Sequence, residues 1–303
     1  MTQSLSTTTR GHRPRVALVT CAEFPDLFDD DQALIPALAA RSVAGEPAVW
    51  DDPAVDWPGY DLAVLRSTWD YTPRRDEFVA WARRVPHLAN PAAVVAWNTD
   101  KRYLAGLAAT GVPVVPTRYL EPGTEPWQPP EHGEYVLKPA VSAGSRDTGR
   151  YDLAEPEQRA LAVAHAQRLR GAGATVMVQP YLRAVDADGE TALMFFRGGY
   201  SHAIRKAALL AGPYRGLDAL FKAEDITPRD ADPAQLSVAE RALAAVPGVR
   251  PADLLYARVD LIPGADGQPL LVELELAEPS LFLDQAPGSA DRFADAIAAH
   301  VAR

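Results

Sequence analysis

Two alternating runs near the end of the chain constrain its fold most strongly. Residues 256–262 read Tyr-Ala-Arg-Val-Asp-Leu-Ile and residues 270–276 read Leu-Leu-Val-Glu-Leu-Glu-Leu, with Gly264 and Gly267 between them. Alternation of apolar and polar residues is typical of a strand, and a short glycine-containing segment between two such runs is typical of a turn. The pattern therefore predicts an antiparallel hairpin over residues 256–276.

The spacing within this hairpin predicts a concentration of charge. Because side chains alternate between the two faces of a strand, Arg258 shares a face with Asp260, and Glu273 shares a face with Glu275. If the two faces coincide, three carboxylates converge and repel one another unless they are protonated or bridged by a cation. Magnesium suits such a site because it is a hard ion that prefers carboxylate and phosphate oxygens. The alternative is the solvent-facing side of an amphipathic hairpin.

The beginning of the chain alternates between strand-like and helix-like segments. Apolar runs at residues 15–21 and 61–66 predict buried strands, and apolar residues at helical spacing predict helices at 34–39 and 74–85. This alternation favours a parallel sheet, whose ligands gather at the carboxyl ends of the strands. Residues 66–71 follow one such end. Three aspartates at residues 29–31 precede the first helix and predict an acidic N-cap.

The rest of the chain mixes strands and helices without internal repeats. We expect strands at residues 135–138, 175–179, 192–196 and 201–205, and helices at residues 99–110, 157–170, 233–245 and 291–301. The fold class predicted from the pattern is an α/β domain followed by an α+β assembly.

A lysine followed by a loop of small residues forms a second candidate site. Lys138 ends an apolar run, and residues 141–149 include two glycines. Small residues let backbone N–H groups approach phosphate oxygens, and a lysine supplies a compact positive charge. A P-loop is excluded because Arg150 and Tyr151 follow where Lys and Ser or Thr are required. The alternative is a flexible surface loop between two strands.

Three further features are compatible with a ligand and equally with ordinary structure. A strand that runs into Pro180 could present main-chain groups to an adenine edge, or could end in a simple turn. Glu190 and Lys206 lie at the ends of expected strands, where either could be a surface charge.

Composition excludes several classes of function. The chain has 303 residues with 30 Lys and Arg against 40 Asp and Glu, and a net charge of −10 repels nucleic acid in the absence of a basic run. No window reaches the roughly 18 apolar residues of a membrane helix. The 6 histidines show no zinc-site spacing. The single cysteine, Cys21, cannot form an internal disulfide, so we expect a cytoplasmic protein.

Taken together and in order, these features resemble the ATP-grasp superfamily of ATP-dependent carboxylate ligases. The resemblance rests on Lys101, Lys138, the small-residue loop, Gln179–Leu182, Glu190, Arg258-x-Asp260 and Glu273-x-Glu275. It implies a flexible tail (1–13), a Rossmann-like domain (14–95) and two α+β subdomains that clasp ATP (96–180 and 181–303). Several stretches also look like the O-ureido-serine cyclo-ligases of cycloserine biosynthesis, among them residues 100–104, 200–203 and 273–280.

The resemblance implies a role for each matching residue. Lys101 and Lys138 would hold phosphates, Gln179, Pro180, Tyr181 and Leu182 would read adenine, and Glu190 would accept from the ribose. The loop that would close over the triphosphate consists of Ser142, Ala143, Gly144, Ser145 and Arg146. Asp260, Glu273 and Glu275 would bind two Mg²⁺ ions, with Mn²⁺ as an alternative metal, although many relatives carry Asn where this chain has Glu275. Arg258 and Lys206 would be catalytic.

Substrate contacts are expected at the end of the second predicted strand and after the hairpin. Arg66 could pair with a substrate carboxylate and Asp70 with an ammonium group, with Ser67, Trp69 and Ser280 beside them. The alternative is that Arg66 forms a structural ion pair and that Trp69 packs in the core.

The implied function is an ATP- and Mg²⁺-dependent ligase that activates a small amino-acid carboxylate as an acyl phosphate and forms an amide or a cyclic amide. An intermolecular ligase that makes dipeptides or γ-glutamyl amides is the alternative, and a non-catalytic nucleotide-binding module is a more remote one. The expected partner is a small amino-acid-like molecule. Assembly as a homodimer stays open, and no nucleic acid or membrane is expected as a partner.

Overall fold

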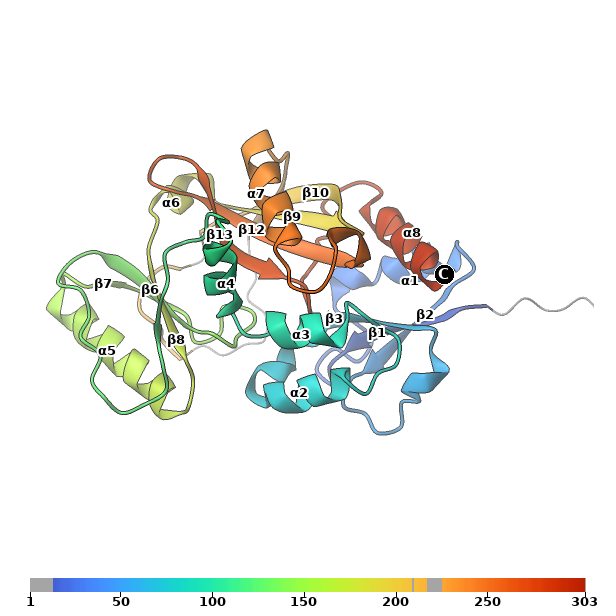
Figure 1. Ribbon diagram of the computed structural model, residues 1–303, viewed down its shortest axis with the longest axis horizontal. Helices are drawn as coiled ribbons and strands as arrows, with labels where there is room; N and C mark the ends of the chain where they lie inside the picture. The colour runs from blue at the N-terminus through green and yellow to red at the C-terminus, as the bar shows by residue number, and fades with distance from the viewer. Residues whose placement is uncertain (1–12, 209, 217–224, 303) are drawn as a thin grey trace, which may run out of the picture.

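Three β-sheets organise the chain in the computed structural model, which describes residues 13–208, 210–216 and 225–302 (Figure 1). The expected tail at residues 1–13 lies outside the described residues except for Arg13. The predicted mixed α/β fold class is confirmed. The division into domains at residues 95 and 180 stays a prediction.

The first sheet is parallel, as the sequence predicts. Its strands lie in the order β2-β1-β3-β4. They are β1 (Arg15–Thr20), β2 (Ala44–Val49), β3 (Leu62–Ser67) and β4 (Leu88–Ala89). The helices of this region are α1 (Leu34–Ala39) and α2 (Arg75–Ala82), with the short 3-10 helices η1 (Asp29–Asp31), η2 (Trp57–Gly59) and η3 (Trp69–Arg74). Trp50, Tyr71, Phe78 and Trp81 pack between the sheet and α2.

The second sheet is antiparallel, has its own core and lies to the left in Figure 1. Its strands, in the order β5-β8-β6-β7, are β5 (Arg118–Leu120), β6 (Glu134–Pro139), β7 (Gly149–Asp152) and β8 (Val176–Pro180). Helix α5 (Pro156–Gly171) covers one face, because Ala162, Ala166 and Leu169 recur at helical spacing and are buried against Leu137 and Val176.

The third sheet is antiparallel and contains the predicted hairpin. Its strands, in the order β11-β10-β9-β12-β13, are β9 (Glu190–Phe196), β10 (Gly199–Lys206), β11 (Ile226–Arg229), β12 (Tyr256–Pro263) and β13 (Pro269–Glu275). Helix α6 (Ala184–Asp188) lies between β8 and β9, and helix α7 (Pro233–Ala244) and the 3-10 helix η4 (Pro251–Asp253) lie between β11 and β12. Arg258 pairs directly with Glu275 and Asp260 with Glu273, so the two charged faces coincide. Gly267, at φ +76°, adopts the turn conformation that favours glycine.

Side chains cover the outer edge of β13. Helices α3 (Ala92–Asn98) and α4 (Tyr103–Ala109) run beside this strand. The amide of Asn98 donates to the backbone oxygen of Leu274 at 2.7 Å, and the hydroxyl of Tyr103 accepts from the Leu274 N–H at 2.8 Å. Because buried backbone groups need partners, these side chains take the place of a neighbouring strand. They also fix Lys101, which lies between them in sequence, beside the hairpin.

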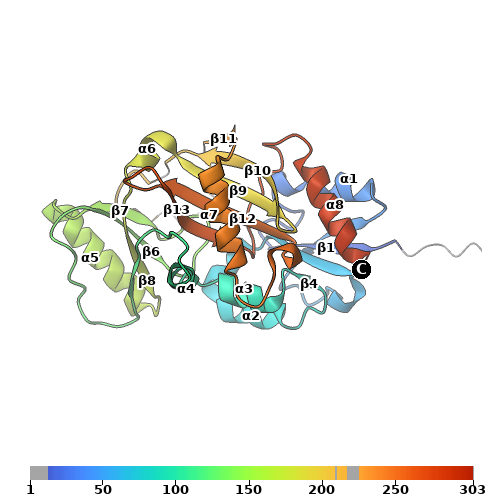
Figure 2. The same ribbon diagram turned by 45° about the horizontal axis from the view of Figure 1, so that its top comes forward.

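The first and third sheets share one hydrophobic core. Val16, Leu18 and Val64 of the first sheet belong to the same buried cluster as Phe196 and Tyr256 of the third. Helix α8 (Ser289–Val301) fills the space between them and lies beside α1 in both views (Figures 1 and 2). Its Phe293 ring stacks on Phe196 with a centroid distance of 4.8 Å.

Two expectations are corrected. The aspartates before α1 do not cap it, because the N-cap residue is Ala33 and makes no side-chain hydrogen bond. Asp31 instead pairs with Arg66, and Asp30 accepts from backbone N–H groups of Phe282 and Leu283. The helix expected at residues 99–110 begins only at Tyr103. In the described part of the chain, no helix is both long and apolar enough to cross a membrane.

Candidate active site

One cavity between the second and third sheets collects most of the residues singled out from the sequence. Those that line it are Trp69, Lys101, Lys138, Ser142, Ala143, Gly144, Ser145, Gln179, Pro180, Tyr181, Leu182, Glu190, Lys206, Arg258, Asp260, Glu273, Glu275 and Ser280. Four others, Arg66, Ser67, Asp70 and Arg146, are not among its lining residues. The solvent-facing alternative for the hairpin is therefore wrong, because its carboxylates face the cavity beneath the lysines.

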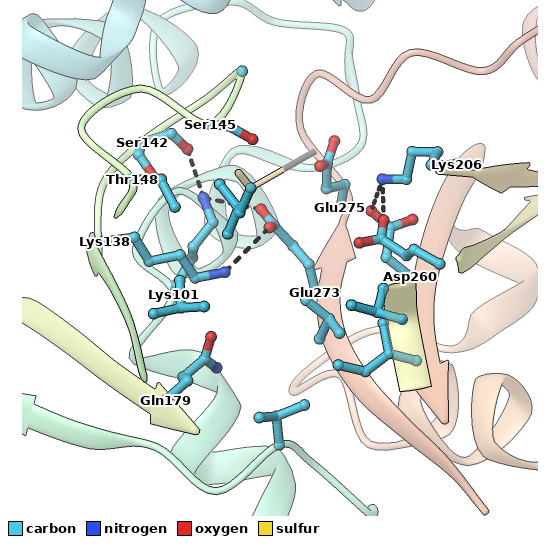
Figure 3. Close-up of a pocket in the computed structure, with 18 of the residues that line it drawn as sticks. Lys101, Lys138, Ser142, Ser145, Thr148, Gln179, Lys206, Asp260, Glu273 and Glu275 are labelled. Carbon is cyan, nitrogen blue, oxygen red and sulfur yellow. Dashed lines mark hydrogen bonds and ion pairs between the residues drawn. The ribbon is translucent and has the colours of Figure 1, made fainter. Parts of the chain in front are cut away.

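Each carboxylate of the hairpin faces a lysine or arginine (Figure 3). Nζ of Lys101 lies 2.9 Å from Oε1 of Glu273, and Nζ of Lys138 lies 3.9 Å from Oε2 of the same residue. Asp260 accepts from Lys206 at 3.0 Å. It also accepts from Arg258 at 2.9 Å, and Arg258 pairs with Glu275 as well. Charges at these distances and this depth interact strongly. The charged side of the hairpin is thus a buried network of ion pairs.

The same network separates the pKa values of its members. Burial acts to raise the pKa of Glu273, but Lys101 and Lys138 outweigh it, so the net pKa lies below the usual range. Burial raises the pKa of Glu275 to about 8, and repulsion from Glu273 and Asp260 adds to that effect while Arg258 opposes it. Burial likewise lowers the pKa of Lys138. Glu275 is therefore a carboxyl that gains its charge at neutral pH only when further positive charge is near.

The donor chemistry of the hairpin fits a divalent cation. Asp260, Glu273 and Glu275 offer hard oxygen atoms to one cavity, and burial together with repulsion from the other two carboxylates raises the pKa of Glu275. Among the residues that the structure describes, however, no three His, Cys, Asp or Glu side chains lie close enough together to form a metal site. The metal assignment of these three carboxylates stays a prediction.

The small-residue loop after β6 forms the opposite wall of the cavity. Its start is fixed by Lys101, whose Nζ donates to the backbone oxygen of Ser142. Gly144 and Ser145 have φ values of +60° and +57°, a conformation that glycine adopts readily and other residues rarely do. At Gly149 an added Cβ would lie 2.7 Å from the backbone nitrogen of Tyr214, so no larger residue fits there. Arg146 points elsewhere, toward Thr72.

The strand end at Pro180 and the pair Glu190–Lys206 complete the cavity. Gln179 is 4% exposed and donates to the hydroxyl of Thr117 at 2.9 Å, so its side chain fixes the strand end and leaves the backbone of the next residues at the wall. Glu190 and Lys206 pair across β9 and β10 and form an ion pair. Both residues line the cavity, so neither is an ordinary surface charge. Their role toward a ligand stays a prediction.

The expected substrate contacts on the first sheet are corrected. Arg66 is fully buried, and its Nε lies 2.9 Å from Oδ1 of Asp31, so the structural alternative holds. Ser67 donates to Asp31 as well. Asp70 accepts from the indole of Trp50 at 2.8 Å and pairs with Arg74. Their polar atoms are engaged by other protein groups, Arg66 also by the backbone oxygen of Pro279, and of these four residues Trp69 alone lines the cavity.

Sequence reasoning gave no individual role to Glu278, which is 9% exposed and lines the cavity with Phe282. The sequence signal was the stretch Glu278-Pro-Ser280 after the hairpin, which belongs to the region expected to recognise the substrate. Burial raises its pKa to about 7, and a hydrogen bond from Tyr71 opposes that shift. A carboxyl of this kind changes charge near neutral pH.

A parallel sheet joined to two antiparallel sheets, with lysines and carboxylates meeting in the cavity between the latter, defines the ATP-grasp ligases. Residues 16–90 match the family described as D-cycloserine synthetase DcsG, N-terminal domain. The cycloserine biosynthesis protein DcsG of Streptomyces lavendulae is 41% identical over an alignment 298 residues long, and the match covers 93% of this chain and 97% of that protein. The chain belongs to the DcsG family of ATP-grasp ligases.

Solved structures agree with this membership. The crystal structure of D-cycloserine synthetase DcsG has a TM-score of 0.81 and 39% identity, and the match covers 95% of this chain and 99% of that one. D-alanine–D-alanine ligase from Bacillus anthracis has a TM-score of 0.65 at 15% identity, over 96% of this chain and 98% of its own, which shows a shared fold. The expectation of an ATP-dependent carbon–nitrogen ligase is confirmed.

Proposed function

We propose that this enzyme closes the ring of O-ureido-serine to make cycloserine, with ATP and Mg²⁺. The observation that carries the proposal is similarity over nearly the whole chain to a relative whose solved structure is described as a D-cycloserine synthetase. The cavity supports it, because buried lysines and carboxylates meet there as phosphoryl transfer requires.

The nucleotide would lie across the cavity between the second and third sheets. Lys101 and Lys138 would hold the α- and β-phosphates, and the loop at Ser142–Ser145 would cover the triphosphate. The backbone of Pro180–Leu182 would meet the adenine edge, and Glu190 would accept from the ribose. The support for this arrangement is that all of these residues line one cavity.

Asp260, Glu273 and Glu275 would hold two Mg²⁺ ions, or Mn²⁺ in their place. These ions supply neutralisation of phosphate charge. The support is the oxygen donor set and the raised pKa of Glu275, which a nearby divalent cation would lower. Lys101 and Lys206 would then share their carboxylate partners with the metal.

The reaction needs no covalent enzyme residue. A carboxylate oxygen of the substrate attacks the γ-phosphorus, the bond from that phosphorus to the oxygen of ADP breaks, and an acyl phosphate results. The ureido nitrogen bonded to oxygen then attacks the acyl carbon and loses its proton, and phosphate leaves as the ring amide forms. Hydrolysis of the bond between this nitrogen and its carbamoyl group consumes one water and releases CO₂ and ammonia, which gives cycloserine. Arg258, held by Asp260 and Glu275, would stabilise negative charge on the carboxylate. Catalysis is then mainly positioning and charge neutralisation.

Product analysis tests this proposal. The purified enzyme is incubated with MgATP and O-ureido-serine, and ADP release is followed together with product mass. Ring closure gives a product built from one substrate molecule and lighter by at least one water, whereas intermolecular ligation joins two molecules. MgATP should also raise the melting temperature of the protein. ADP release together with a product built from two molecules would contradict the proposal. So would the absence of ADP release with O-ureido-serine when another amino acid is consumed.

A further inference from the structure

The segment from Glu278 to Leu283 is held by side chains from strands β3, β10 and β12 and from the 3-10 helices η1 and η3. The indole of Trp69 in η3 donates to the Glu278 oxygen at 3.0 Å, and Arg66 of β3 donates to the Pro279 oxygen at 2.7 Å. Asp30 accepts from the N–H groups of Phe282 and Leu283. Arg258 donates to the Ser280 oxygen, and His202 contacts the Leu281 oxygen.

This segment is consequently a rigid wall of the cavity. Phe282 has a φ of +49°, which a phenylalanine adopts only where its surroundings fix the backbone. Such over-determined backbone is common where a protein must present a side chain to a ligand in one geometry. The side chains presented here are those of Glu278, Ser280 and Phe282.

Glu278 differs from the other hairpin-side carboxylates in its partners. Asp260, Glu273 and Glu275 each lie within 4.0 Å of a lysine or arginine nitrogen. Within the described ranges, no lysine or arginine nitrogen lies that close to the Glu278 carboxylate, whose hydrogen-bond partner is the hydroxyl of Tyr71. Tyr71 is 2% exposed and cannot turn away to solvent. One buried carboxyl in the cavity is thus hydrogen-bonded but makes no ion pair, and the charge of Lys101 acts on it only from beyond 4.0 Å.

A buried carboxylate without a cation is costly, and the cost disappears when a cationic group binds it. The cationic group of an amino-acid substrate is its α-ammonium, which keeps its charge while the carboxylate of the same molecule reacts beside Arg258. We propose that Glu278 binds the α-ammonium of the substrate, positioned by Tyr71. This proposal rests on the proposed function only in requiring an amino-acid substrate. It explains why Glu278, Ser280 and Trp69 share the cavity wall with Arg258.

Paired ligands test the assignment. Binding of O-ureido-serine and of its analogue with hydrogen in place of the ammonium group is measured by calorimetry in the presence of MgADP, for the wild type, Glu278→Gln and Glu278→Asp. We expect the wild type to bind the ammonium-bearing ligand about 10- to 100-fold more tightly than the analogue, because a charge-assisted hydrogen bond contributes that much. Glu278→Gln should lose this preference, and Glu278→Asp should retain part of it. Glu157→Gln, an exposed glutamate in α5, is the matched control and should keep the preference intact.

Kinetic constants add an independent readout. Glu278→Gln should raise KM for O-ureido-serine about tenfold or more while KM for ATP stays within twofold, since the lost contact is to the substrate ammonium. If Glu278→Gln weakened the binding of O-ureido-serine and of its analogue equally, the assignment would be overturned, because Glu278 would then support the metal site or the fold. Unchanged preference in Glu278→Gln would overturn it as well. If O-ureido-serine binds to neither the wild type nor the variants, the proposed function fails. The same paired test is then applied to the amino acid in whose presence the enzyme does release ADP.

Discussion

Nζ of Lys101 lies 2.9 Å from Oε1 of Glu273, although one residue precedes α4 and the other lies near the end of β13. The contact joins the side chains that would hold phosphate to those that would hold metal. Lys101 approaches because Asn98 and Tyr103, on either side of it, hydrogen-bond the edge of β13. The position of the lysine is therefore set by the backbone of the strand that carries the glutamate.

Replacing Glu273 by Gln should reduce turnover on the order of 100-fold or more, because it removes one negative charge from the predicted metal ligands. The fold should survive, since glutamine has the same shape and can still accept from Lys101. ADP release and thermal melting measure the two effects. Turnover at the wild-type rate would refute the role of Glu273, and Glu157→Gln serves as the surface control.

Replacing Lys138 by Met should raise KM for ATP about tenfold or more and reduce the stabilisation that MgATP gives. The lysine is 9% exposed, and a methionine fills its volume without the charge that a phosphate requires. Thermal shift across a series of MgATP concentrations measures this loss. Arg84→Met, at an exposed position, is the charge-matched control, and an unchanged MgATP response in Lys138→Met would remove Lys138 from the nucleotide site.

Replacing Arg66 by Met should destabilise the protein by about 3–5 kcal/mol, because it leaves the carboxylate of Asp31 buried without its partner. The double variant Arg66→Met/Asp31→Asn should regain part of this loss. Denaturant unfolding gives the free energies. If Arg66→Met unfolds like the wild type but binds substrate poorly, Arg66 is a substrate contact after all.

Stability should fall as the pH decreases from 6.5 to 4 because of His165. Burial lowers its pKa from 6.5 to about 4, with the positive charge of Arg168 adding to the effect. Between these values the unfolded chain binds a proton that the folded chain does not, so the free energy of unfolding decreases as pH falls, by up to about 3 kcal/mol.

The variant His165→Asn tests this, since its amide can still accept from Tyr151, the partner of His165 at 2.8 Å. Unfolding measured at several pH values should show a shallower decline in the variant than in the wild type. Identical pH profiles would show that His165 does not carry the effect.

The alternation predicted the hairpin but left open whether its two charged faces coincide. They coincide in the structure because Arg258 pairs with Glu275 and Asp260 with Glu273, a register that buries Val259 and Leu274 together. It did not predict that Arg66 is buried, since a strand-end arginine has the same local pattern whether its partner is a substrate or Asp31. That choice is decided by η1, whose aspartates face inward to Arg66 and to the segment at residues 282–283.

Elements that were not predicted are mostly short or lack periodicity. Strand β2 reads Ala-Gly-Glu-Pro-Ala-Val and pairs with β1 despite its proline, because it lies at the edge of the sheet. Helix α3 follows Pro91 and depends on contacts with β13 that are far away in sequence. The role of Glu278 needed the structure, because only its burial and the lack of an ion pair, among the described residues, distinguish it from the neighbouring glutamates.

The core shared by the first and third sheets restricts how this enzyme can be recombined with its relatives. A chimera that exchanges residues 14–90 would bring Val16, Leu18 and Val64 from another ligase against the resident Phe196 and Tyr256. Such a graft would have to carry α8 and the facing strands with it. The sheet beneath α5 has an interior of its own and is the natural unit for transplantation between enzymes.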